Sequence, residues 1–154
     1  MPKSLFFYKK NCENKIPKGK NLNEVDMTLI NSVKKNIPNL INLINKQNLN
    51  DYIKMVVRFS FDANKYFNDS EPWSLKKSNP ERMNSILFTI SEQIKNISIL
   101  LNPIIPLSTN KVLQTMNFKI KDVLIENIYK DGTLDHINEL KELEILFKKV
   151  ENDN

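Results

Sequence analysis

Apolar residues recur at spacings of three and four along three long stretches of the chain, and this spacing is typical of amphipathic helices. The first stretch runs from residue 25 to residue 44, with Asn23 suited to cap its start and Pro38 expected to kink or split it. Its apolar positions are Val25, Leu29, Val33, Ile37, Leu40, Ile41 and Ile44. The pattern predicts a long first helix with one face toward a core.

Two further helices are predicted after short breaks. The second covers roughly residues 50–68 and ends at the breaker-rich sequence 69–72. Its apolar stripe consists of Ile53, Val56, Val57, Phe61 and Phe67. The third has Asn79 as its N-cap and Pro80 in its first position, and it ends at Asn102, before Pro103. A short helix is predicted over residues 108–116, after which the periodicity weakens.

Three long helices joined by short connections predict an all-α fold, an antiparallel helical bundle with a partly irregular C-terminal tail. A chain of 154 residues that is 40% apolar suits a single domain with its own core. We expect one domain over 1–154. Within it, 1–20 holds the end of a truncated helix and a basic connection, 21–118 the bundle core, and 119–154 a tail packed on the bundle.

The composition excludes several kinds of functional site. The chain has only 2 glycines, too few for a glycine-rich phosphate loop. Its single cysteine, Cys12, cannot form an internal disulfide and favours a reducing compartment. With His136 as the only histidine, a two-histidine metal site cannot form and a Cys/His zinc cluster lacks ligands. No apolar run reaches the ~18 residues of a membrane span. We therefore expect a binding domain with no catalytic, cofactor-binding or metal-binding residue and no membrane partner.

The only tryptophan, Trp73, directly follows Pro72 between the second and third predicted helices. Proteins hold unpaired bases by stacking them on aromatic rings while cationic side chains neutralise the backbone. Candidates for such contacts surround the tryptophan in the sequence: Arg58, Asn64, Lys65, Lys76 and Lys77. A net charge of +5 permits an anionic partner. The alternative is that Trp73 packs into the core, Asn64 bridges helices, and the lysines form solvated surface.

At these residues the chain resembles the anticodon-binding domain of bacterial methionyl-tRNA synthetases. Residues 63–75 (ANKYFNDSEPWSL) are similar to that family's Ala-Asn-Arg-Tyr motif with a following Pro-Trp-x-Leu. Residues 11–17 (NCENKIP), 100–106 (LLNPIIP) and 145–151 (ILFKKVE) resemble further family segments. The class I synthetases for valine, leucine and isoleucine carry similar Pro-Trp turns, whereas the Leu-Phe ending favours methionine. The implied fold is a bundle of the class I synthetase anticodon-binding type.

The resemblance also implies roles for individual residues. In the family, the tryptophan of the Pro-Trp turn stacks on the first anticodon base, a cytosine, and this role falls to Trp73. A second family element is an Asn-x-x-x-Arg helix, whose arginine position is taken here by Lys3 and whose asparagine would precede Met1. Lysine keeps the charge of arginine but lacks the planar fork that matches a base edge. The expected RNA-binding residues are Lys3, Arg58, Asn64, Lys65, Trp73, Lys76 and Lys77.

By the same resemblance, the parent enzyme joins methionine to its tRNA using ATP. The family's catalytic motifs are not found in this sequence, so ATP and the catalytic domain are expected outside this chain, which should be inactive alone. The expected partners are the anticodon loop of a tRNA and that catalytic domain, in a cytoplasmic protein that is a monomer. Two alternatives are a structural or protein-interaction bundle, and the equivalent domain of another class I synthetase.

Overall fold

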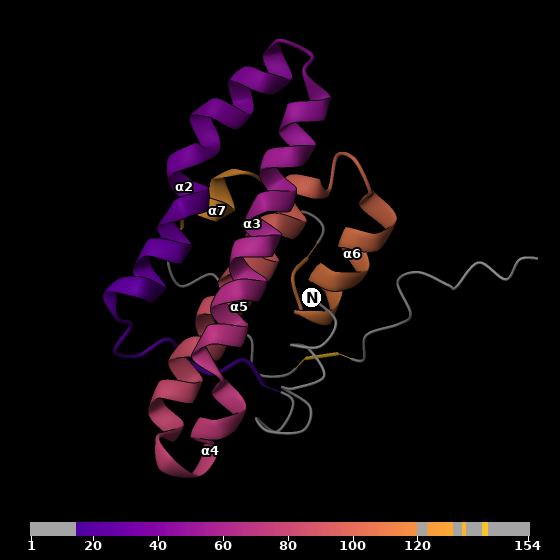
Figure 1. The fold of residues 1–154 in the computed structure, drawn as a ribbon. Helices are drawn as coiled ribbons and strands as arrows, with labels where there is room; N and C mark the ends of the chain where they lie inside the picture. Colours follow the sequence, from indigo (N-terminus) through magenta and orange to yellow (C-terminus); the bar gives the residue numbers. More distant parts are fainter. Residues whose placement is uncertain (1–14, 120–122, 131–133, 135–139, 142–154) are drawn as a thin grey trace, which may run out of the picture.

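The chain folds into a helical bundle, as the hydrophobic pattern predicts (Figure 1). The computed structural model describes residues 15–119, 123–130, 134 and 140–141, and these residues include no strand. The elements in chain order are α2 (Glu24–Asn45), α3 (Leu49–Ser70), the 3-10 helix η1 (Pro72–Ser74), α4 (Leu75–Ser78), α5 (Pro80–Leu101), α6 (Pro106–Thr115) and α7 (Glu126–Tyr129). The all-α antiparallel fold is confirmed within this part of the chain.

Helix α2 begins where its cap predicts. The Asn23 side chain accepts a hydrogen bond from the Asp26 backbone N–H, and the Asp26 carboxylate accepts one from the Asn23 N–H, each at 3.0 Å. This capping box satisfies two backbone donors at the helix start. Helix α2 continues through Pro38, so Pro38 does not split the helix, and a kink there stays a prediction. Pro38 itself lies on the exposed face of α2.

Helix α3 buries only part of the stripe that the sequence pattern predicts: Val56 is buried, and Ile53 and Phe67 are partly buried against the core. Its buried residues are Tyr52, Val56, Phe59, Ala63 and Tyr66, whereas Val57 and Phe61 are exposed. Two tyrosines take part in this row because their hydroxyl groups find partners. The Tyr52 hydroxyl donates to the Leu100 carbonyl at 2.7 Å, near the far end of α5. The start of α3 therefore lies beside the end of α5, as in an antiparallel pair.

Helix α5 lies at the centre of the bundle, in contact with α2, α3 and α6. Every residue from 85 to 100 is buried, so α5 lacks a solvent face over that range. Burial includes the ion pair of Lys95 with Glu92, whose Nζ and Oε2 atoms are 2.6 Å apart. The buried Gln93 side chain donates to the Leu29 carbonyl of α2 at 2.7 Å. Its amide nitrogen is therefore hydrogen-bonded, as buried polar groups usually are.

The connection that precedes α2 packs against the first turns of α5. Ile16 is buried, and a Cβ atom placed on Gly19 would collide with the ring of Phe88. The Ser85 hydroxyl donates to the Lys20 carbonyl at 2.6 Å. The absence of a side chain at Gly19 therefore lets the connection approach α5 closely.

The part of the C-terminal region that is described adds to the same core. Ile128, Leu134 and Leu140 are buried, and the Lys141 N–H donates to the Thr115 carbonyl at 2.9 Å. Lys3 and His136 lie outside the described residues. The boundaries at 20 and 118 stay predictions. In the described parts of the chain, no helix is long and apolar enough to cross a membrane.

Candidate functional site

The tryptophan sits on a tight corner between α3 and α4, formed by residues 71–74 and called here the Trp73 corner. Glu71 has a left-handed backbone with φ 42° and ψ 54°, a conformation uncommon outside glycine. The Ser74 N–H and hydroxyl group donate to the Glu71 carbonyl at 2.9 Å and 2.8 Å. Pro72 is buried. The backbone under Trp73 is therefore fixed by a reversal, a buried proline and two hydrogen bonds.

The Trp73 ring is held in place while part of it remains in solvent. Its residue exposure is 49%, which argues against a core role. Its centroid lies 5.8 Å from that of Phe67, with the rings inclined at 66°, an edge-to-face arrangement. Such aromatic pairs contribute about 0.5–1.5 kcal/mol beyond their buried area. Trp73 thus presents aromatic surface from an orientation that Phe67 supports.

The cations expected around Trp73 are exposed on α3 and α4. Arg58 and Lys65 are on α3, and Lys76 and Lys77 occupy the last turn of α4. Lys65 pairs with Asp69 at 3.1 Å, and both side chains are well exposed to solvent. Exposed pairs of this kind contribute about 0.2–1 kcal/mol, so Lys65 can exchange its partner for an anionic ligand.

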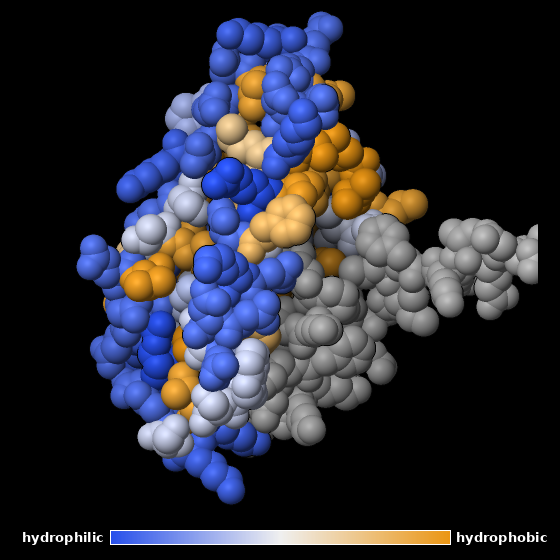
Figure 2. All heavy atoms as spheres, viewed as in Figure 1, coloured by the Kyte–Doolittle hydropathy of each residue, from blue (hydrophilic) through white to orange (hydrophobic). Residues whose placement is uncertain are grey.

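The outer face of α3 carries two apolar residues, Val57 and Phe61, that the hydrophobic pattern had placed on the buried stripe. Phe61 is 68% exposed, and Asn64 and Lys65, one turn further on, are exposed as well. Asn64 is therefore available to a ligand rather than buried between helices. Figure 2 shows apolar surface along α3 and toward α6, where the exposed apolar residues are Val57, Phe61, Ile105 and Leu107.

These positions come from α3 and from the Trp73 corner with α4. Phe61, Asn64 and Lys65 share a face of α3, and Trp73 follows at the corner with Lys76 and Lys77 on α4. Arg58 lies two turns before Lys65 on α3. Lys3 cannot be placed relative to them because it lies outside the described residues. The described residues contain no group of three or more His, Cys, Asp or Glu that could hold a metal ion.

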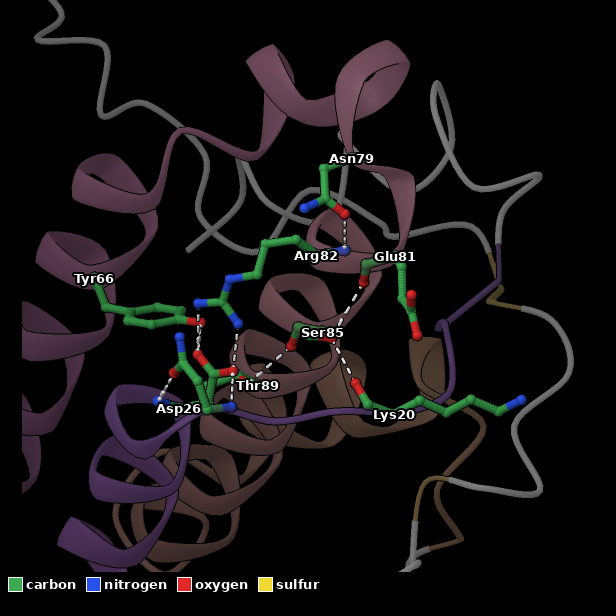
Figure 3. Close-up of polar contacts among 9 residues, drawn as sticks. Lys20, Asp26, Tyr66, Asn79, Glu81, Arg82, Ser85 and Thr89 are labelled. Carbon is green, nitrogen blue, oxygen red and sulfur yellow. Dashed lines mark hydrogen bonds and ion pairs between the residues drawn. The ribbon is translucent and has the colours of Figure 1, made fainter.

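A buried polar cluster lies at the same end of the bundle as the Trp73 corner (Figure 3). We call Asp26, Tyr66 and Arg82 the Asp26 cluster. The Asp26 carboxylate, with 0% exposure, accepts from the Tyr66 hydroxyl at 2.5 Å. Arg82 donates to both of its oxygens, from Nη1 at 2.5 Å and from Nη2 at 2.9 Å. The cluster joins α2, α3 and α5 through one carboxylate, and the sequence pattern gave no sign of it.

Electrostatics keep this carboxylate ionised. Burial alone would raise the pKa of Asp26, but hydrogen bonds from Arg82, Tyr66 and the Asn23 backbone outweigh burial and hold the pKa below its usual value. Burial, together with the neighbouring Asp26 carboxylate, raises the pKa of Tyr66, so its hydroxyl remains a donor. The same hydrogen bond to Asp26 raises the pKa of Arg82. The cluster is thus a stable ion pair with an added neutral donor.

Comparisons with known proteins agree on one family. The family model described as the anticodon binding domain of methionyl tRNA ligase matches residues 16–154. The methionine–tRNA ligase of Rickettsia felis is 32% identical over 111 residues, which cover 72% of this chain and 22% of that protein. The methionine–tRNA ligase of Rickettsia conorii is 29% identical over 126 residues, covering 82% of this chain and 25% of that protein.

A solved structure has the same fold. The crystal structure of the apo form of Mycobacterium tuberculosis methionyl-tRNA synthetase superposes with a TM-score of 0.89 at 20% identity. The match covers 98% of this chain and 31% of that one. The chain therefore spans between 22% and 31% of the length of the Rickettsia felis and Mycobacterium tuberculosis proteins.

Proposed function

This chain belongs to the family of anticodon-binding domains of methionyl-tRNA ligases, and from that membership we propose that it binds the anticodon loop of a methionine tRNA. The observation that carries the proposal is the half-exposed ring of Trp73, supported by Phe67 at a rigid corner. Stacking of a base on such a ring contributes about 1–3 kcal/mol. In this proposal the stacked base is the first of the anticodon, a cytosine.

The remaining site residues contribute charge and hydrogen bonds. Arg58, Lys65, Lys76 and Lys77 neutralise phosphates of the loop, which gives affinity that decreases as the salt concentration rises. Asn64 offers a donor and an acceptor to a base edge. Lys3 would add a further cation from the segment preceding the connection. All of these residues except Lys3 are described, and all of the described ones are exposed. This exposure supports the proposed roles, because each side chain can reach a ligand without unfolding of the chain.

We further propose that the chain works as part of a larger ligase. The relatives are methionine–tRNA ligases several times longer than the matched region, so ATP binding and methionine transfer would belong to a catalytic domain outside this sequence. The domain alone would be inactive in aminoacylation. We expect a cytoplasmic, monomeric protein without a membrane partner.

Substituting Trp73 tests the proposal. The ligand is a hairpin RNA with a CAU loop, titrated at fixed salt. Loss of one stacking contact of about 1–3 kcal/mol predicts that Trp73→Ala weakens binding by about 5- to 150-fold. Leu107→Ala is the matched control, because Leu107 is an exposed apolar residue (82%) on another helix, and it should bind as the unsubstituted chain does.

A second RNA identifies the contact. A hairpin that lacks the first anticodon base should bind the unsubstituted chain and Trp73→Ala with the same reduced affinity, because there is no base to stack. Circular dichroism checks that each variant is folded. If folded Trp73→Ala binds the CAU hairpin as tightly as the unsubstituted chain, the stacking role is wrong. A preference for a different anticodon would instead favour the equivalent domain of another class I synthetase.

A further inference from the structure

The segment that carries Trp73 is attached to the bundle at two helix ends. Residues 71–79 leave the end of α3 and enter the start of α5. Tyr66 lies one turn before the end of α3, and Arg82 lies in the first turn of α5, which Asn79 caps at 3.0 Å. The relative position of these two helix ends therefore determines how the Trp73 corner is presented.

One carboxylate from a third helix binds both ends. Asp26 accepts from the Tyr66 hydroxyl on the α3 side and from the Arg82 guanidinium on the α5 side (Figure 3). Tyr66 is also directly followed by Phe67, the residue that supports the Trp73 ring. We propose that Asp26 is a positioning residue for the RNA site, because it holds the two helix ends in the one arrangement that orients Trp73 for stacking. The proposal rests on the proposed function of Trp73.

The burial of Asp26 distinguishes this role from ordinary helix capping. A capping aspartate needs only the backbone contact to Asn23, and it can remain in solvent. Asp26 is instead fully buried, and taking an ionised carboxylate out of water is unfavourable unless several donors compensate for it. Three side-chain hydrogen bonds from two other helices supply that compensation. Removing one donor should therefore loosen the helix ends.

The connection before α2 is attached to the same turns of α5. The Asn21 side-chain amide donates to the Glu81 carboxylate at 2.6 Å, and Ser85 donates to the Lys20 carbonyl. The segment by which the chain enters the bundle and the Trp73 corner thus share the first turns of α5 as a common support. A variant that loosens the Asp26 cluster should affect the corner more than the distant end of the bundle.

Two buried tyrosines on α3 provide a matched test. Tyr66→Phe removes one hydroxyl from the Asp26 cluster, and Tyr52→Phe removes one hydroxyl from the contact with Leu100 near the opposite end of α3. Each change removes one buried hydroxyl donor, to a neutral carbonyl for Tyr52 and to an ionised carboxylate for Tyr66. Loss of a neutral bond typically changes an equilibrium by about two- to twelvefold, and loss of a bond to a charged group by about 12- to 150-fold. Time-resolved fluorescence anisotropy of Trp73, the only tryptophan, measures the mobility of the ring without RNA.

We expect Tyr66→Phe to increase the amplitude of Trp73 motion and to weaken binding of the CAU hairpin by about two- to tenfold, a fraction of what the lost hydrogen bond contributes. Tyr52→Phe should leave both quantities unchanged, even where it lowers stability by as much as Tyr66→Phe. Asp26→Asn should have a larger effect in the same direction. Arg82→Lys, which retains the charge, should weaken binding less than Arg82→Gln.

Two outcomes would overturn the proposal. One is that Tyr66→Phe gives the same Trp73 anisotropy as Tyr52→Phe. The other is that the two variants lose affinity for the hairpin equally. Failure of the proposed function is distinguishable from both. If the unsubstituted chain does not bind the hairpin, RNA binding is wrong, while the anisotropy comparison still decides whether the Asp26 cluster positions Trp73.

Discussion

At the scale of single residues, the site depends on aromatic side chains that are exposed to solvent but held in a defined orientation. Trp73 packs its ring against Phe67 and keeps about half of its surface exposed, at 49%. Phe61 goes further, with 68% exposure on the outer face of α3. An exposed aromatic residue next to amide and cationic side chains is a surface suited to bases, because every base has an apolar face and a polar edge.

Phe61 therefore yields a residue-scale prediction. Phe61→Ala should weaken binding of the CAU hairpin by about 5- to 150-fold if its ring stacks on a second base of the loop. Its midpoint in urea should change little, since exposed side chains contribute less to stability than buried ones. Titration of the hairpin and urea unfolding measure the two effects. The idea fails if Phe61→Ala binds as tightly as the control Leu107→Ala.

At the scale of elements, helix ends were predictable from the sequence and helix faces were less so. Asn23, Asn79 and Pro80 act locally, so the starts of α2 and α5 could be identified. The buried face of α3 includes Tyr52 and Tyr66, whose hydroxyl groups bond to partners far along the chain. Local hydrophobicity does not record such partners, which explains why the Asp26 cluster was missed and Phe61 was assigned to the core.

The candidate site, like the helices, was predictable from the sequence only in its local features. The sequence identified Trp73 and its cations because an aromatic residue after proline and nearby lysines are local features. It could not decide between a core ring and an exposed one, because that depends on how α3 and α5 meet at the corner. Left-handed Glu71 and the edge contact with Phe67 decide it. Neither is visible in a pattern of apolar and polar positions.

Helix α5 supplies an element-scale prediction, because it buries an ion pair at the centre of the bundle. Lys95→Met removes the partner of buried Glu92, whose other oxygen, Oε1, lacks a hydrogen-bond partner in the structure as described. Breaking a buried pair in this way costs about 3–5 kcal/mol. The double variant Glu92→Leu/Lys95→Met replaces both charges by apolar groups and should be more stable than Lys95→Met alone. Urea unfolding compares them, and an equal or lower midpoint for the double variant would contradict this account.

At the scale of the whole molecule, polar contacts hold the two ends of the bundle differently. Near one end, the Tyr52 hydroxyl joins α3 to α5 by a neutral hydrogen bond to Leu100. At the other end, next to the Trp73 corner, the Asp26 cluster joins three helices by an ion pair. Only the second contact involves a carboxylate, so acid should weaken the end of the molecule that carries the site.

The pH dependence of stability tests this difference. The pKa of Asp26 is lower in the folded chain than its ordinary value of 3.8, so its contribution to stability is present above that value. The contribution is lost as the pH falls below 3.8 and through the lower folded pKa, because the unfolded chain takes up the proton first. The free energy of unfolding should therefore decline on the acid side. Asp26→Asn should flatten that decline and, by removing charged hydrogen bonds, cost about 1.5–3 kcal/mol at neutral pH.

The matched control is Asp51→Asn. Asp51 lies in the first turn of α3, and its backbone N–H donates to the side chain of the N-cap residue Asn48. The backbone N–H of Asp26 donates to the N-cap residue Asn23 in the same way. The two aspartates differ in burial, because Asp51 is exposed. Urea unfolding measured between acid and neutral pH should show the same acid-side decline in the free energy of unfolding for Asp51→Asn as for the unsubstituted chain. If both aspartate variants flatten this acid-side decline equally, the acid sensitivity comes from helix capping rather than from the Asp26 cluster. If neither does, other carboxylates control it, and the end of the bundle that carries Trp73 is not the acid-labile one.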